Sequence, residues 1–139
     1  MDEPVEPSVV GLSYSGGFYF NDPARHSEDA KFKADNFLKL FLRFASQNSI
    51  CIKSFIDVGC GSGSVIELIS DALEKNGFAG VAFKGYDVSP HVRNIQNDNI
   101  EFVHGDFCQS DELVDLVTLF DVFEHVTDPI ANVFRSVCS

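Results

Sequence analysis

The chain has few basic residues and no long hydrophobic run, and each shortage argues against a class of function. Only 10 Lys and Arg stand against 21 Asp and Glu, which gives a net charge of -11 at pH 7. Binding to a phosphate backbone depends on neutralising phosphates with basic side chains, so nucleic acid is not expected as a partner. No apolar run approaches the roughly 18 residues that a membrane span needs, so no membrane partner is expected either.

Closely spaced cysteines and a signal peptide are also missing. The four cysteines, Cys51, Cys60, Cys108 and Cys138, form no C-x-x-C pair and do not cluster with the histidines. Because metal ligands stand at short, regular spacings, we predict no metal site. Residues 1–7 are acidic and proline-rich, unlike the basic and apolar start of a secretory signal, so a cytoplasmic protein is expected.

The chain has the size and composition of one soluble domain. It holds 139 residues, 45% of them hydrophobic and 22% charged, which suits a single core. Residues 1–27 mix Pro, Gly, Ser and aromatic residues without a clear period, and they predict an N-terminal arm or lid. We expect the domain itself to occupy residues 28–139.

A helical pattern begins at about Ser27. Its apolar residues fall at positions i, i+3, i+4 and i+7, and basic residues such as Lys33 lie largely off that stripe. This spacing favours a helix that packs on a sheet over a helix that binds a partner. The residues of the predicted stripe are Phe37, Leu40, Phe41 and Phe44.

Strands and helices alternate after this first helix. The alternation predicts a parallel, right-handed α/β sheet that binds its ligand at the carboxyl ends of the strands. Strands are expected at about 52–58, 81–87, 100–104 and 114–121, and helices at about 64–75, 89–96 and 128–138.

A glycine-rich turn follows the first strand. Gly59, Gly61 and Gly63 permit positive φ and let a ligand approach the backbone, while the helix from Ser64 brings its N–H groups close to that ligand. Such a turn alone does not distinguish a dinucleotide from another adenosine cofactor. A dinucleotide fingerprint that begins at Gly59 needs glycine at position 64, whereas Ser64 stands there and Asp57 precedes the turn.

The stretch from Phe55 to Gly63 resembles motif I of the class I S-adenosylmethionine-dependent methyltransferases, an acidic residue followed by x-G-x-G-x-G. The final stretch, with Asp128-Pro129, looks like the small-molecule subgroup that includes enzymes of quinone biosynthesis. Three further motifs stand at the next strand ends in the family's order: Gly85-Tyr86-Asp87-Val88-Ser89, His104-Gly105-Asp106-Phe107, and Leu119-Phe120-Asp121-Val122-Phe123-Glu124-His125-Val126.

The resemblance implies a Rossmann-like parallel sheet with helices on both faces and S-adenosylmethionine as cofactor. A complete member has seven strands in the order 3-2-1-4-5-7-6, so residues 28–139 are expected to supply only the 3-2-1-4 half of a methyltransferase domain, as a fragment without the C-terminal strands. The apolar fourth strand then forms an exposed edge, which predicts self-association or a partner there.

The resemblance also assigns the site. Asp57 and the loop residues Gly59, Cys60, Gly61 and Gly63 are expected near the methionine part, with Cys60 as a filler. The ribose hydroxyls fall to Asp87, and the adenine falls to Val88, Asp106 and Phe107. Near the transferable methyl the resemblance places Phe120 and Asp121. His125 is a candidate general base on a substrate hydroxyl, and a structural role in the strand–helix turn is the alternative.

Three functions are compatible with these motifs. The first is a methyltransferase that acts on a small-molecule acceptor by in-line transfer, as a fragment or with its missing strands supplied by a partner. A noncatalytic module that binds S-adenosylmethionine is the second. The third, an NAD-binding oxidoreductase, is disfavoured by Ser64 and Asp57.

Overall fold

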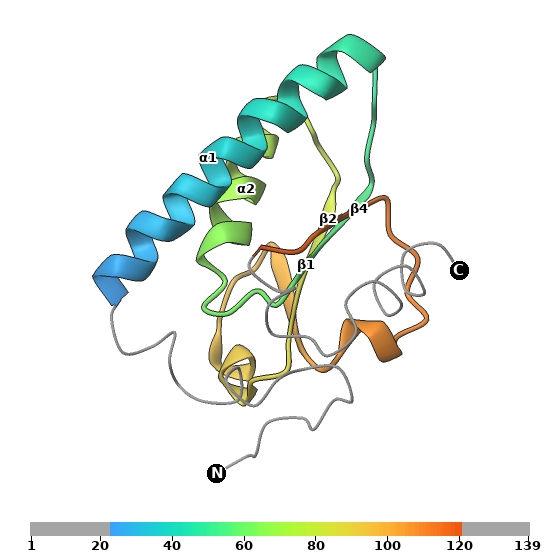
Figure 1. Ribbon diagram of the computed structural model, residues 1–139. Coiled ribbons are helices and arrows are strands. Elements are labelled where there is room, and N and C mark those ends of the chain that lie inside the picture. Colours follow the sequence, from blue (N-terminus) through green and yellow to red (C-terminus); the bar gives the residue numbers. More distant parts are fainter. Residues whose placement is uncertain (1–22, 121–139) are drawn as a thin grey trace.

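Four parallel strands form one sheet in the order β3-β2-β1-β4 (Figure 1). The computed structural model describes residues 23–120 of the chain. The strands are β1 (Ser54–Val58), β2 (Ala82–Asp87), β3 (Ile100–His104) and β4 (Leu116–Thr118). The helices are α1 (Pro23–Asn48), α2 (Ser64–Lys75) and the short 3-10 helices η3 (Pro90–Asn94) and η4 (Phe107–Gln109).

The strand order confirms the predicted 3-2-1-4 arrangement, and β3 and α2 have the predicted bounds. Strands β1 and β2 begin at Ser54 and Ala82, slightly later than the predicted 52 and 81, and two other elements differ more. Strand β4 is shorter than predicted, because its ladder with β1 covers only the three residues opposite Phe55, Ile56 and Asp57. The predicted helix over 89–96 is only the five-residue η3, which ends where Ile95 turns to extended backbone. The helix predicted over 128–138 lies outside the described residues.

The main core lies between the sheet and two helices on one of its faces. Alternate strand residues point to opposite faces, so Phe55 and Phe83 face α1 and α2, while Ile56 and Tyr86 form a second cluster with Phe107 of η4. Helices α1 and α2 lie side by side over the first face (Figure 1). Helix α2 contributes three fully buried side chains to this core, Ile66, Ile69 and Leu73.

The face that α1 buries differs from the predicted stripe. Phe41 is buried, but Leu40 is 70% exposed and Phe44 is 54% exposed. The buried stripe is instead built largely from alanines, and small side chains let the helix backbone approach its neighbours closely. The prediction rested on large apolar residues alone, and it therefore assigned the buried face of α1 to the wrong side of the helix at Leu40 and Phe44. The other buried residues of α1 are Ala30, Ala34 and Ala45.

Helix α1 also begins before Ser27, at Pro23, since proline is tolerated in the first turn of a helix. Of the predicted arm, residues 1–22 lie outside the described residues. Among the helices of residues 23–120, none combines the length and the apolarity that a bilayer crossing requires.

The Phe102 ring packs between two glycines, and one of them, Gly63, is the N-cap residue of α2. Gly63 has a φ of 83°, and a Cβ built there would lie 2.7 Å from Phe102 Cζ. A Cβ on Gly85 would lie 2.9 Å from the same ring, so the ring packs closely against both glycines. Gly63 therefore satisfies both a left-handed backbone and a close contact.

We predict that Gly63→Ala destabilises the fold more than Gly77→Ala. Gly77 has a φ of 88°, but a Cβ there has nothing within 4 Å, so this control measures backbone strain alone, about 1 to 2 kcal/mol. The contact with Phe102 should add about 1 to 3 kcal/mol for overpacking. Urea unfolding of both variants checks this, and equal losses would contradict the packing role of Gly63.

Candidate functional site

The glycine loop between β1 and α2 is fastened to the end of β2. The backbone N–H groups of Gly59 and Cys60 donate to the Tyr86 carbonyl at 2.7 and 3.0 Å. The N–H of Gly63 then donates to the Cys60 carbonyl at 2.9 Å, which closes the turn into α2. Parallel strands end at the same edge of the sheet, so these bonds place the loop over that edge.

Asp87, at the tip of β2, holds the loop through its side chain. Its carboxylate is buried, and it accepts from the N–H of Gly61 at 2.7 Å and from the N–H of Ser89 at 2.8 Å. A carboxylate has about four acceptor positions. These two backbone contacts are therefore compatible with the ribose contact predicted for Asp87, which stays a prediction.

Asp57 is a buried carboxylate at the end of β1. It is 2% exposed, and its Oδ1 accepts a hydrogen bond from the Thr118 hydroxyl of β4 at 2.9 Å. Burial raises the pKa of Asp57 to about 7; the nearby charge of Asp87 adds to the rise, whereas the Thr118 bond and the charge of Lys33 oppose it. A cationic group in the adjoining pocket would stabilise the ionised form.

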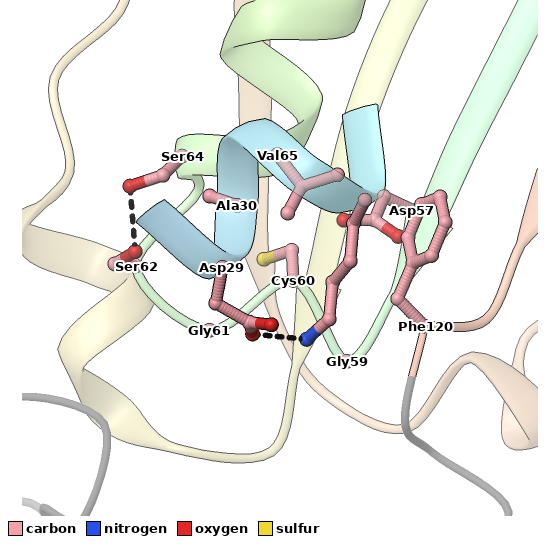
Figure 2. A pocket seen from close by; sticks show the side chains of 11 residues that line it. Asp29, Ala30, Asp57, Gly59, Cys60, Gly61, Ser62, Ser64, Val65 and Phe120 are labelled. Atoms are coloured by element: carbon pink, nitrogen blue, oxygen red, sulfur yellow. Dashed lines mark hydrogen bonds and ion pairs between the residues drawn. The ribbon is translucent and has the colours of Figure 1, made fainter. Parts of the chain in front are cut away.

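A pocket opens between the glycine loop and the first turns of α1 (Figure 2). Figure 2 shows the Asp29 side chain reaching from α1 over the loop. A Cβ built on Gly61, whose φ is 56°, would have nothing within 4 Å, so the loop backbone is open to close approach here. The lining residues are Asp29, Ala30, Lys33, Asp57, Gly59, Cys60, Gly61, Ser62, Ser64, Val65 and Phe120.

The structure brings five of the predicted site residues into this pocket: Asp57, Gly59, Cys60, Gly61 and Phe120. Two others support its wall, because Gly63 is the N-cap residue of α2 and Asp87 accepts a hydrogen bond from the Gly61 N–H. Cys60 is buried, and burial raises its thiol pKa; its filling role stays a prediction. Asp121 and His125 lie outside the described residues, so their roles stay predictions.

The residues predicted to bind adenine lie at the neighbouring strand ends, and they do not line this pocket. Val88 is buried after β2, and Phe107 is buried against Tyr86 with ring centroids 5.4 Å apart. Asp106 Oδ1 accepts from the N–H of Cys108 at 3.0 Å, while Oδ2 is buried and has no hydrogen-bond partner in the described structure. A buried acceptor without a partner costs about 1 to 3 kcal/mol, so a donor from a ligand would stabilise this site.

Sequence reasoning missed the contribution of α1 to the pocket. Lys33 lies off the predicted stripe, yet its side chain is only 18% exposed, and its Nζ is 2.6 Å from Oδ2 of Asp29. The sequence signal is an Asp and a Lys four residues apart on a helix, which is also common on fully solvated helix faces. That spacing could not by itself distinguish a pocket from a surface.

Comparisons with known proteins agree with this geometry. A family model described as a methyltransferase domain matches residues 25–139. The plantazolicin methyltransferase BpumL in complex with a triazolic desmethylPZN analog and SAH has a similar structure, with 21% sequence identity and a TM-score of 0.60 over 86% of this chain. Its complex with SAH alone gives 22% identity and a TM-score of 0.55 over 84% of this chain.

The chain spans about half the length of these solved structures, 50% and 49%. Likeness at this level of identity shows a shared fold. Among curated proteins no match was found.

We predict that Asp57→Asn stabilises the ligand-free protein increasingly as pH rises. The folded pKa of about 7 lies above the ordinary value of 3.8, so between these values the folded state binds more protons than the unfolded state and wild-type stability falls. Asparagine does not ionise and still accepts from Thr118. The advantage of the variant should grow from about pH 4 to pH 7 and then level off, at no more than about 4 kcal/mol.

Urea unfolding between pH 5 and pH 8 measures this difference. Asp71→Asn, on the exposed side of α2, is the matched control for the same change of side chain. Parallel curves for Asp57→Asn and the wild type would show that Asp57 ionises normally.

Proposed function

Because the chain belongs to the methyltransferase domain family and has the class I fold, we propose that it binds S-adenosylmethionine and serves in-line methyl transfer to a small-molecule acceptor. One observation carries the proposal. The glycine loop presents an open backbone at Gly61, fixed by the buried carboxylate of Asp87, beside the second buried carboxylate of Asp57. This arrangement suits a cationic ligand that carries a ribose.

The residues present fit the cofactor in chemistry as well as in position. Asp57 and the loop from Gly59 to Gly63 would hold its methionine part, and Asp87 its ribose hydroxyls. The unpartnered Oδ2 of Asp106 is an acceptor of the kind that an adenine amino group requires. Phe120 at the pocket wall would then lie near the methyl group.

When bound, S-adenosylmethionine supplies a methyl group that its sulfonium already makes electrophilic. The work left to the protein is therefore alignment and exclusion of water. Placing the acceptor directly behind the methyl group can supply about 7 to 11 kcal/mol of barrier reduction. A base is required only for an acceptor that must lose a proton early, and His125 is the proposed base for that case.

The fourth strand is the proposed place for further structure to join. Within residues 23–120, β4 pairs with β1 alone and lies at the edge of the sheet. An unpaired edge offers a row of backbone donors and acceptors to another strand. We propose that further strands pair there and complete the acceptor site, supplied by the rest of a longer chain, by a partner or by a second copy of this chain.

A noncatalytic cofactor-binding module is the second candidate, favoured by the concentration of predicted cofactor residues in the described half. Calorimetric titration with S-adenosylhomocysteine and NAD tests what both candidates share. We expect saturable binding of S-adenosylhomocysteine and none of NAD, because Ser64 replaces the third glycine of a dinucleotide loop. Binding of NAD alone would overturn the proposal.

In the same titration, Asp87→Ala should weaken S-adenosylhomocysteine binding by about 1 to 3 kcal/mol, because charged hydrogen bonds to the ligand and to Gly61 are lost. Asp115→Ala is the matched control. The Asp115 carboxylate also accepts two backbone N–H groups, from Lys53 and Ser54 at 2.7 and 3.2 Å, but it does so at the opposite end of β1. Equal affinity losses in the two folded variants would show that Asp87 acts only through stability.

A further inference from the structure

An ion pair on α1 faces the part of the pocket assigned to the methionine end of the cofactor. Lys33 Nζ lies 2.6 Å from Asp29 Oδ2, one helical turn earlier. Both residues line the same pocket as Asp57 and the glycine loop, and Figure 2 shows the Asp29 end of this pair. The Lys33 side chain is 18% exposed and that of Asp29 is 49% exposed, so Lys33 is the more buried partner of the ion pair.

Positive potential converges on this corner of the pocket from two elements. Lys33 is the only basic residue among the described lining residues, and it lies close enough to Asp57 to influence its ionisation. The first turn of α2 supplies Ser64 and Val65 to the opposite wall, and a helix N-terminus carries a partial positive charge. Negative charge comes from Asp29 and Asp57, which flank Lys33.

We propose that this corner recognises the α-amino acid end of S-adenosylmethionine, with Lys33 exchanging Asp29 for the carboxylate of the ligand. The inference rests on the proposed function and adds Lys33 as the residue that recognises the amino acid part of the cofactor. A zwitterion carries one charge of each sign. When its carboxylate replaces Asp29 on Lys33, the displaced acid and Asp57 are left to face its ammonium, so no charge loses a partner.

The exchange is favourable because the ion pair of Lys33 with Asp29 is weaker than the proposed ion pair of Lys33 with the ligand carboxylate. A half-exposed helix pair contributes little, typically 0 to about 1 kcal/mol. A ligand carboxylate placed between Lys33 and the N-terminus of α2 has two sources of positive potential, whereas Asp29 is anchored one turn away on α1 alone. If the pair served only to brace the helix, Lys33 would affect stability and not the choice of ligand.

Calorimetry on the full chain separates these roles with two probes. S-adenosylhomocysteine has the amino acid end, and 5′-methylthioadenosine has the nucleoside and thioether without it. Lys33→Gln should weaken S-adenosylhomocysteine binding about tenfold or more and leave methylthioadenosine binding within about twofold. The matched control is Lys39→Gln, an equal change of charge on the exposed side of α1, and it should leave both affinities unchanged.

Two further measurements keep the test sharp if Lys33→Gln folds poorly. The wild-type protein should bind decarboxylated S-adenosylmethionine about tenfold or more weakly than S-adenosylmethionine. The double exchange Asp29→Lys with Lys33→Asp retains a helix pair but reverses its order, so it should not restore S-adenosylhomocysteine binding. Restored binding would show a bracing role and overturn the inference.

The outcomes also distinguish this inference from the function on which it rests. If the wild type binds neither S-adenosylhomocysteine nor methylthioadenosine, the proposed function fails. If it binds both, and Lys33→Gln leaves the ratio of the two affinities unchanged, the inference about Lys33 fails and the proposed function stands.

Discussion

The hydrogen bond from the Gly61 N–H to the buried carboxylate of Asp87 is the contact on which the site depends. Burying a carboxylate is costly unless hydrogen bonds compensate, and the backbone of the glycine loop supplies one of them. The same bond fixes the glycine loop to the end of β2. Asp57, at the end of the neighbouring strand β1, accepts a hydrogen bond from the Thr118 hydroxyl, and burial raises its pKa to about 7. The ligand-free site thus carries an electrostatic cost that a cation would relieve.

Much of the fold could be predicted because local signals and tertiary structure agree there. Helix α2 and strand β3 have a clear hydrophobic periodicity, and glycine or other turn residues mark where they begin and end. The order of the motifs resembles that of a known family, and this resemblance supplied the strand order. The face of α1 could not be predicted, since alanines such as Ala34 carry a weak hydrophobic signal yet permit the closest packing. The length of β4 depends on its pairing with β1, which no local pattern encodes.

The acidic residues of the site were predicted from the sequence, but their hydrogen-bond partners and the contribution of α1 were not. Asp57 and Asp87 stand at strand ends as expected, but the backbone partners of Asp87 follow from the path of the loop in three dimensions. Lys33 was missed because its neighbours in the sequence look like an ordinary solvated helix. The chain shares its fold with larger methyltransferase structures and spans about half of their length, so the described residues supply the part of that fold in which the cofactor site was predicted.

The proposed cofactor site lies over the carboxyl ends of β1 and β2. Backbone amide NMR during titration with S-adenosylhomocysteine tests it most directly. We expect large chemical-shift changes at Gly59 to Gly63 and at Ser89, with none at Gly77, Gly80 or Asp115, which lie toward the opposite ends of the strands. Changes confined to that opposite end, or a silent glycine loop under saturating ligand, would contradict it.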